Sequence, residues 1–172
     1  HATYRQPLSA SKQGKSAEAG DLYAKVADNP KSVYIKEATI DAGRSYYQAG
    51  KWDQSAARLR KTLELGGAEV PEAAHWLARI LIDQQKKYAE AAKLAAETIP
   101  KAEGSEYLVN LKLDEADAKY ETPATRAESL TLYAAIAENH AESPLAEQEL
   151  YNTDYAALQL KNYDEELKHA AE

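Results

Sequence analysis

The stretch GRSYYQAGKWDQSAARLRKTL (residues 43–63) predicts the end of one helix, a glycine turn and the start of a second helix. Gly50 suits the left-handed residue that ends a helix, and Asp53 suits the N-cap of the next one. A small residue followed four places later by an apolar residue returns along the whole chain, although a glutamate takes the first position in the last pair. The pairs are Ala19/Tyr23, Ser55/Leu59, Ala91/Ala95, Ser129/Tyr133 and Glu166/Ala170.

These pairs are separated by 36, 36, 38 and 37 residues. A repeat of this length is typical of helical hairpins stacked into a solenoid, so the sequence predicts an all-α fold. Glycine and proline, with 7 and 6 copies, fall mainly at the ends of the expected helices. The expected spans are 14–29, 32–49, 53–65, a helix opened by Pro71, 88–100, 105–120, 123–140, 144–160 and a last helix to residue 172.

Apolar residues recur at helical spacing within these spans. In the helix expected for residues 32–49, Val33, Ala38, Ala42 and Tyr46 should face inward. Residues 1–13 are short and polar and contain Pro7, so this segment is expected to be irregular or a truncated repeat.

Residues 14–172 are expected to form about four and a half repeats. The terminal repeats of a solenoid normally carry a polar outer face. Neither end of this chain has such a cap, so the sequence is interpreted as a fragment of a longer protein.

The composition excludes several classes of function. The formal net charge of −7 disfavours nucleic acid as a partner, because binding phosphates needs clustered Lys and Arg. No apolar run approaches the ~20 residues that span a bilayer, so no direct membrane insertion is expected. Cysteine is absent, which rules out disulfides and thiolate chemistry within these residues.

Residues 43–63 resemble the tetratricopeptide repeat. The matching features are a small residue in the first helix of each hairpin, a tyrosine three places later, a Gly-x-aromatic turn and a small residue in the second helix. They correspond to Gly43 and Ala78, Tyr46, Gly50-Lys51-Trp52, and Ser55 and Ala91. The resemblance implies a right-handed superhelix of stacked antiparallel hairpins over residues 14–172, which binds other proteins. Asp154 and Glu166 depart from the pattern, because the family has alanine there.

Residues 133–151 (YAAIAENHAESPLAEQELY) resemble the link between repeats in a bacterial group of cell-envelope assembly proteins. This second resemblance favours a periplasmic or cell-envelope location over a cytoplasmic one.

No catalytic motif is present. The four histidines are far apart and show no metal-binding spacing, and no phosphate-binding glycine loop or nucleophile elbow occurs. The expected function is therefore non-enzymatic, with no metal and no cofactor.

The resemblance also implies a concave groove lined by the first helix of each repeat. The groove residues are then expected to be Ile40, Arg44, Tyr47, His75 and Arg79, with Tyr151 and Tyr155 in the fifth repeat. Arg44 and Arg79 have two interpretations. They could grip an acidic or C-terminal peptide, or they could pair with carboxylates on neighbouring helices.

The expected partner is a protein that places a peptide segment or a helix in this groove. Two alternatives remain open at this point. The chain could be a structural subunit of a large envelope or membrane-associated complex, or a helical accessory domain of a larger enzyme.

Overall fold

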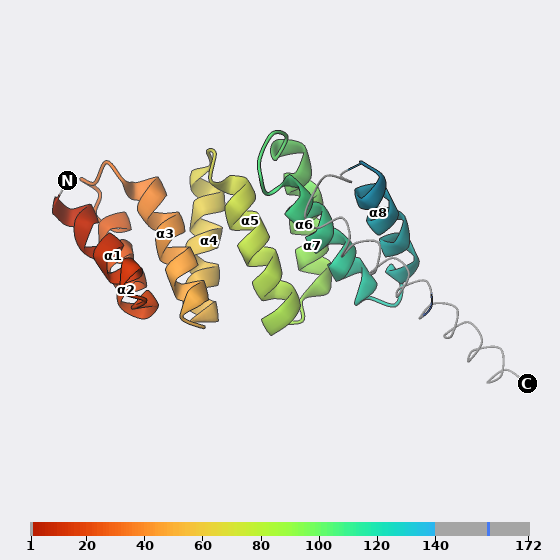
Figure 1. The fold of residues 1–172 in the computed structure, drawn as a ribbon, viewed down its shortest axis with the longest axis horizontal. Coiled ribbons are helices and arrows are strands. Elements are labelled where there is room, and N and C mark those ends of the chain that lie inside the picture. Colours follow the sequence, from red (N-terminus) through yellow and green to blue (C-terminus); the bar gives the residue numbers. More distant parts are fainter. Residues whose placement is uncertain (1, 140–157, 159–172) are drawn as a thin grey trace, which may run out of the picture. The chain divides into compact units, whose positions relative to one another are not determined.

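The computed structural model describes residues 2–139 and residue 158 (Figure 1). Its described residues contain helices and turns and no strand, so the predicted all-α class is confirmed. None of the described helices has the length and apolar character needed to cross a membrane. The chain forms two compact units, residues 1–85 and residues 86–172.

The first unit consists of helices joined by short turns, and helices that follow each other in the chain pack side by side (Figure 1). Its elements are α1 (Ala2–Lys12), α2 (Ser16–Ala27), α3 (Ile35–Gln48), α4 (Trp52–Leu65), α5 (Val70–Arg79) and the π-helical turn η1 (Ile80–Gln84). Helix α3 also contacts α5, so it has neighbours on several sides.

The second unit also consists of helices that pack against their neighbours in the sequence. Its described elements are α6 (Tyr88–Thr98), the 3₁₀ turn η2 (Ile99–Lys101), α7 (Leu108–Tyr120) and α8 (Arg126–Asn139). Helix α7 packs against both α6 and α8. The hairpin predicted after residue 140, with Tyr151, Asp154, Tyr155 and Glu166, lies outside the described residues.

The backbone of the turns repeats with a period of 36 residues. Gly14 and Gly50 have φ of 73° and 70°, and Lys86, a further 36 residues on, has φ of 53°. Each is followed by a lysine at the N-cap with nearly the same dihedral angles: Lys15 (−87°, 62°), Lys51 (−87°, 69°) and Lys87 (−94°, 62°). The left-handed conformation predicted for Gly50 is therefore confirmed, and Lys86 adopts it without being glycine.

The small-residue positions of the repeat are buried as predicted. Ala19, Ser55, Ala91 and Ser129 are each 0% exposed. In the first unit these contacts bring backbones close together, because the Ser55 hydroxyl donates a hydrogen bond of 2.8 Å to the Gly43 carbonyl. A Cβ atom at Gly43 would lie only 2.9 Å from Leu59 Cδ2, so any larger residue there would force the Leu59 side chain to shift.

Helices α2 and α3 are joined by a polar contact behind the turn at Gly50. The Tyr46 hydroxyl donates a hydrogen bond of 2.9 Å to Asp21 Oδ1. Lys51 Nζ lies 3.8 Å from the same oxygen and 5.5 Å from the centre of the Tyr46 ring. Burial, and then the hydrogen bond to Asp21, raise the pKa of Tyr46 to about 12. These contacts hold the side chain of Lys51, which directly precedes Trp52 in the sequence.

Three local expectations were wrong. Val33 was expected to face inward, but it is 83% exposed, because α3 begins only at Ile35. The preceding loop is held by side-chain hydrogen bonds to its own backbone, which compete with a helix. Asp53 is not the N-cap of α4, since the helix begins at Trp52 after Lys51. Residues 2–12 form a helix that contains Pro7, so the irregular segment given as one option for residues 1–13 is wrong.

The helical state around Pro7 has a packing reason. Proline removes one backbone hydrogen bond and crowds the preceding turn. The Pro7 side chain is among the most deeply buried of the described residues, and α1 packs along α2. Burial of the ring therefore offsets the missing donor.

Candidate functional site

Three aromatic rings from three helices meet at the surface of the first unit. Tyr47 comes from the last turn of α3, Trp52 is the first residue of α4, and Trp76 comes from α5. The Tyr47 ring centre lies 5.2 Å from that of Trp52, edge to face at 76°, and 4.8 Å from that of Trp76, tilted by 52°. All three side chains are half-buried. Trp52 and Trp76 are the only two tryptophans of the 172-residue sequence.

The spacing of the residues explains why the rings converge. Gly50 ends α3 three residues after Tyr47, and its left-handed turn starts α4 at Trp52. Trp76 lies one turn after Glu72 on the side of α5 that meets α3. Its indole Nε1 donates a hydrogen bond of 3.3 Å to Glu72 Oε1.

Charged side chains border the rings. Arg44 Nη1 lies 3.2 Å from Glu72 Oε1, and Arg44 also pairs with Asp41 one turn earlier in α3. Arg79 Nη2 pairs with Asp83 at 3.0 Å. Glu72 thus joins Arg44 to Trp76, which ties α3 to α5 by a polar contact at the edge of the aromatic cluster.

The residues expected to line the groove separate into different environments. Arg44, Tyr47, His75 and Arg79 are half-buried. Tyr47 belongs to the aromatic cluster, Arg44 reaches Trp76 through Glu72, and the His75 ring lies 4.8 Å from that of Trp76. Arg79 lies one turn after Trp76 in α5. Ile40 is only 3% exposed and belongs to the core. Its expected surface position was wrong, because α3 packs against α2, α4 and α5 and so buries most of its circumference. We call Arg44, Tyr47, Trp52, His75, Trp76 and Arg79 the aromatic surface.

The two arginines follow the interpretation in which they pair with carboxylates. Arg44 reaches Glu72 on a neighbouring helix, while Arg79 pairs with Asp83 within its own chain segment, four residues on. Half-exposed ion pairs of this kind contribute only ~0–1 kcal/mol each. A carboxylate of another molecule can therefore replace the carboxylate in such a pair with little net change in free energy.

Sequence reasoning did not select the two tryptophans as site residues. Trp52 was identified only as the aromatic residue of the turn, and Trp76 lies in the helix that Pro71 was expected to open. Their rarity was the available signal, since large aromatic residues that stay half-exposed on a helical surface are enriched in binding sites.

A recess of about 490 Å³ adjoins Trp52, between the turn at Gly50 and the end of the π-helical turn. Polar side chains line it, including Asp53, Gln54 and Gln85. The Gln85 Oε1 atom is buried and accepts no hydrogen bond within the described part of the chain. The recess therefore extends the aromatic surface with a polar side.

Among residues 2–139 and residue 158, no three His, Asp or Glu side chains are grouped so that they could hold a metal ion. The chain matches no protein-family model, and no curated protein sequence matches it.

Proposed function

We propose that this chain is a non-enzymatic scaffold of tetratricopeptide type that binds a segment of a partner protein on its aromatic surface. The 36-residue recurrence of the left-handed turns supports a repeat architecture. The close approach of α3 and α4 at Gly43 supports the hairpin packing of that family. A right-handed superhelix of about four and a half repeats is part of the proposal.

The observation that carries the proposal is the cluster of Tyr47, Trp52 and Trp76. Tryptophan, tyrosine and arginine are enriched among the few residues that carry most of the binding energy of protein interfaces, and these residues cluster in well-packed places near the interface centre. Here the rings already contact each other, so little side-chain freedom is lost on binding. A peptide segment or a helix with apolar side chains fits such a surface.

The charges at its edge set orientation more than affinity. Arg44 and Arg79 are paired with carboxylates of the same chain, so an acidic partner would have to replace one carboxylate by another. We therefore expect the apolar contacts with the two tryptophans to supply most of the binding free energy.

The test is capture of partners by the native protein and by two variants. Trp76→Ala should weaken binding by at least about 2 kcal/mol, or roughly 30-fold. The matched control is Tyr120→Ala, which removes a half-buried aromatic residue from the second unit and should leave affinity unchanged. Because both tryptophans of the sequence lie in the aromatic surface, a tryptophan-free peptide that binds there should change their fluorescence.

Equal affinity of the native protein and folded Trp76→Ala for every captured partner would refute the proposal. The double variant Arg44→Glu/Arg79→Glu should weaken binding by less than about tenfold, since each arginine is already paired. A larger loss than that of Trp76→Ala would assign the affinity to the arginines instead.

A further inference from the structure

A second concave surface lies in the first unit, away from the aromatic cluster. It is a recess of about 330 Å³ between α1, α2 and the loop that joins α2 to α3. We call it the α2–α3 recess. Apolar side chains from two helices line it: Pro7 of α1 and Val26 of α2 are buried, and Leu22 is half-buried. A volume of this size accommodates one or two apolar side chains of a ligand.

The loop that borders the recess is held in a fixed conformation. The Lys31 backbone N–H donates to Asn29 Oδ1 at 3.0 Å, and the Tyr34 backbone N–H donates to Ser32 Oγ at 3.1 Å. These bonds keep Val33 at the mouth of the recess with 83% of its surface exposed. A ligand that covers Val33 removes this apolar side chain from water and gains affinity from its burial.

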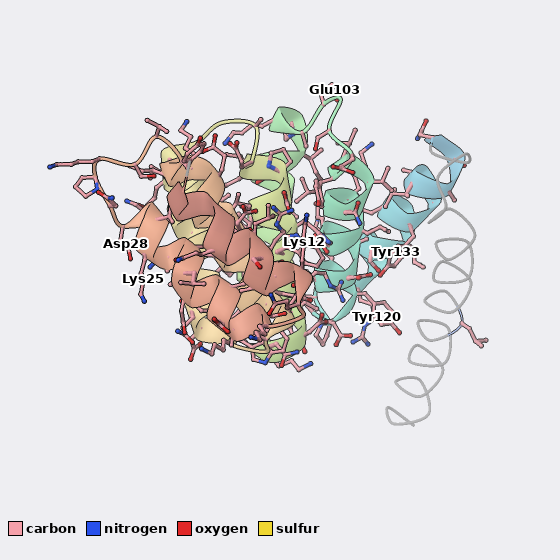
Figure 2. All side chains as sticks on the ribbon, turned by 60° about the vertical axis from the view of Figure 1, so that its left-hand side comes forward. Lys12, Lys25, Asp28, Glu103, Tyr120 and Tyr133 are labelled. Atoms are coloured by element: carbon pink, nitrogen blue, oxygen red, sulfur yellow. The ribbon has the colours of Figure 1, made fainter. Side chains whose placement is uncertain are left out.

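The charges around the recess have one sign. Lys25 and Lys31 line it, and no carboxylate does. Within the described part of the chain neither lysine forms an ion pair. Asp28, which lies at the same edge of the unit as Lys25 (Figure 2), is instead held by Arg58 through two hydrogen bonds of 2.6 and 2.7 Å. The two lysine charges therefore remain available to a ligand.

The charge of the whole unit agrees with this local pattern. Residues 1–85 contain 12 Lys and Arg and 10 Asp and Glu, whereas residues 86–172 contain 9 and 18. The net charge of −7 thus arises in the second unit, and an anionic ligand meets no excess of negative charge in the first.

We propose that the α2–α3 recess binds a short peptide segment in which apolar side chains are flanked by Asp or Glu. The apolar side chains cover Val33 and enter the space between Leu22 and Val26. The carboxylates pair with Lys25 and Lys31. This site is separate from the aromatic surface, and it does not depend on what binds there.

The sequence offers a direct probe of the proposal, because it contains four valines. Val26 and Val33 line the recess, whereas Val70 opens α5 and Val109 lies in α7. Valine-methyl NMR spectra of the full chain would be recorded with the peptide acetyl-Glu-Glu-Leu-Leu-Glu-Glu-amide. We expect saturable shifts of the Val26 and Val33 signals, with Val70 and Val109 unchanged.

Two comparisons separate charge from apolar contact. The counterpart acetyl-Lys-Lys-Leu-Leu-Lys-Lys-amide should bind at least about tenfold more weakly. The variant Lys25→Glu/Lys31→Glu should weaken binding of the acidic peptide by a similar factor. Lys61→Glu, an exposed position on α4 outside the recess, is the matched control and should leave binding unchanged. Val33→Ser should weaken binding without loss of the fold.

The proposal is overturned if the acidic peptide fails to shift Val26 and Val33 at millimolar concentration. It is also overturned if the basic peptide binds equally well, or if Lys25→Glu/Lys31→Glu binds as the native protein does. A third contrary result concerns membranes. Shifts or broadening of Val33 with phosphatidylserine vesicles, but none with the peptide, would assign the recess to an anionic lipid surface.

Discussion

Replacing Gly43 by alanine is expected to destabilise the contact between α3 and α4. A Cβ atom at this position would lie 2.9 Å from Cδ2 and 3.1 Å from Cγ of Leu59. Leu59 is 0% exposed, so its side chain can move only against its buried neighbours. Overpacking of a core costs ~1–3 kcal/mol, and contacts this short place the cost near the upper end. The better helix propensity of alanine returns about 1 kcal/mol, which leaves roughly 2 kcal/mol of net destabilisation.

A second substitution tests the cause. Leu59→Ala alone should cost ~2–5 kcal/mol, because it leaves a cavity. In that background Gly43→Ala should be stabilising by up to about 1 kcal/mol, since the new methyl group enters vacated space and the propensity gain remains. The coupling energy between the two positions is then roughly 3 kcal/mol.

The assay is urea unfolding of the four proteins, followed by far-ultraviolet circular dichroism and by tryptophan fluorescence. The slope with denaturant must stay constant across the set for the free energies to be comparable. Free energies that add within about 0.5 kcal/mol would refute the argument, because independent sites behave in that way. So would a Gly43→Ala variant more stable than the native protein.

Further changes test the turns and the buried polar contacts. Lys86→Gly should raise the free energy of unfolding by about 0.5–1 kcal/mol, because Lys86 holds φ at 53°, whereas Lys87→Gly should lower it; thermal unfolding measures both. The raised pKa of Tyr46 contributes stability that is complete below about pH 10 and is lost as the pH rises toward about 12, so Tyr46→Phe should flatten this alkaline loss in unfolding experiments between those values. The hydrogen bond from Arg58 lowers the pKa of Asp28, so Asp28→Asn should cost less than about 1 kcal/mol at neutral pH and lose stability less steeply than the native protein below about pH 4.

The parts of the fold that rest on strong local signals could be predicted from the sequence. Gly50 indicates its turn because glycine adopts a left-handed conformation without strain. Pro71 lies in the first turn of α5, where its missing N–H has no partner to lose. The turn at Lys86 has the same backbone, but no glycine announces it, so only the 36-residue spacing could have indicated it.

The residues of the candidate site were harder to predict from the sequence, for a different reason. A periodic pattern tells which residues share a helix face, but it does not tell how many neighbours enclose that helix. Ile40 follows the spacing of a groove residue, yet contacts of α3 on several sides bury it. Tyr47 remains partly exposed because it lies at the end of α3. The rings of Trp52 and Trp76 contact it there. Convergence of three helices is a tertiary property that no single stretch of sequence contains.

The matching backbone at Gly14 and Gly50 makes the first unit modular. The segment from Lys15 to Gly50 contains α2 and α3 entire, and its two junctions match: Gly14 has the backbone conformation of Gly50, and Lys15 that of Lys51. If a second copy of this segment were inserted after Gly50, its Lys15 would take the place of Lys51 after the turn. Both junctions would then have backbone angles that the chain already adopts. Duplication of one gene segment would then lengthen the first unit by two helices in a single step, with the same turn geometry at both junctions.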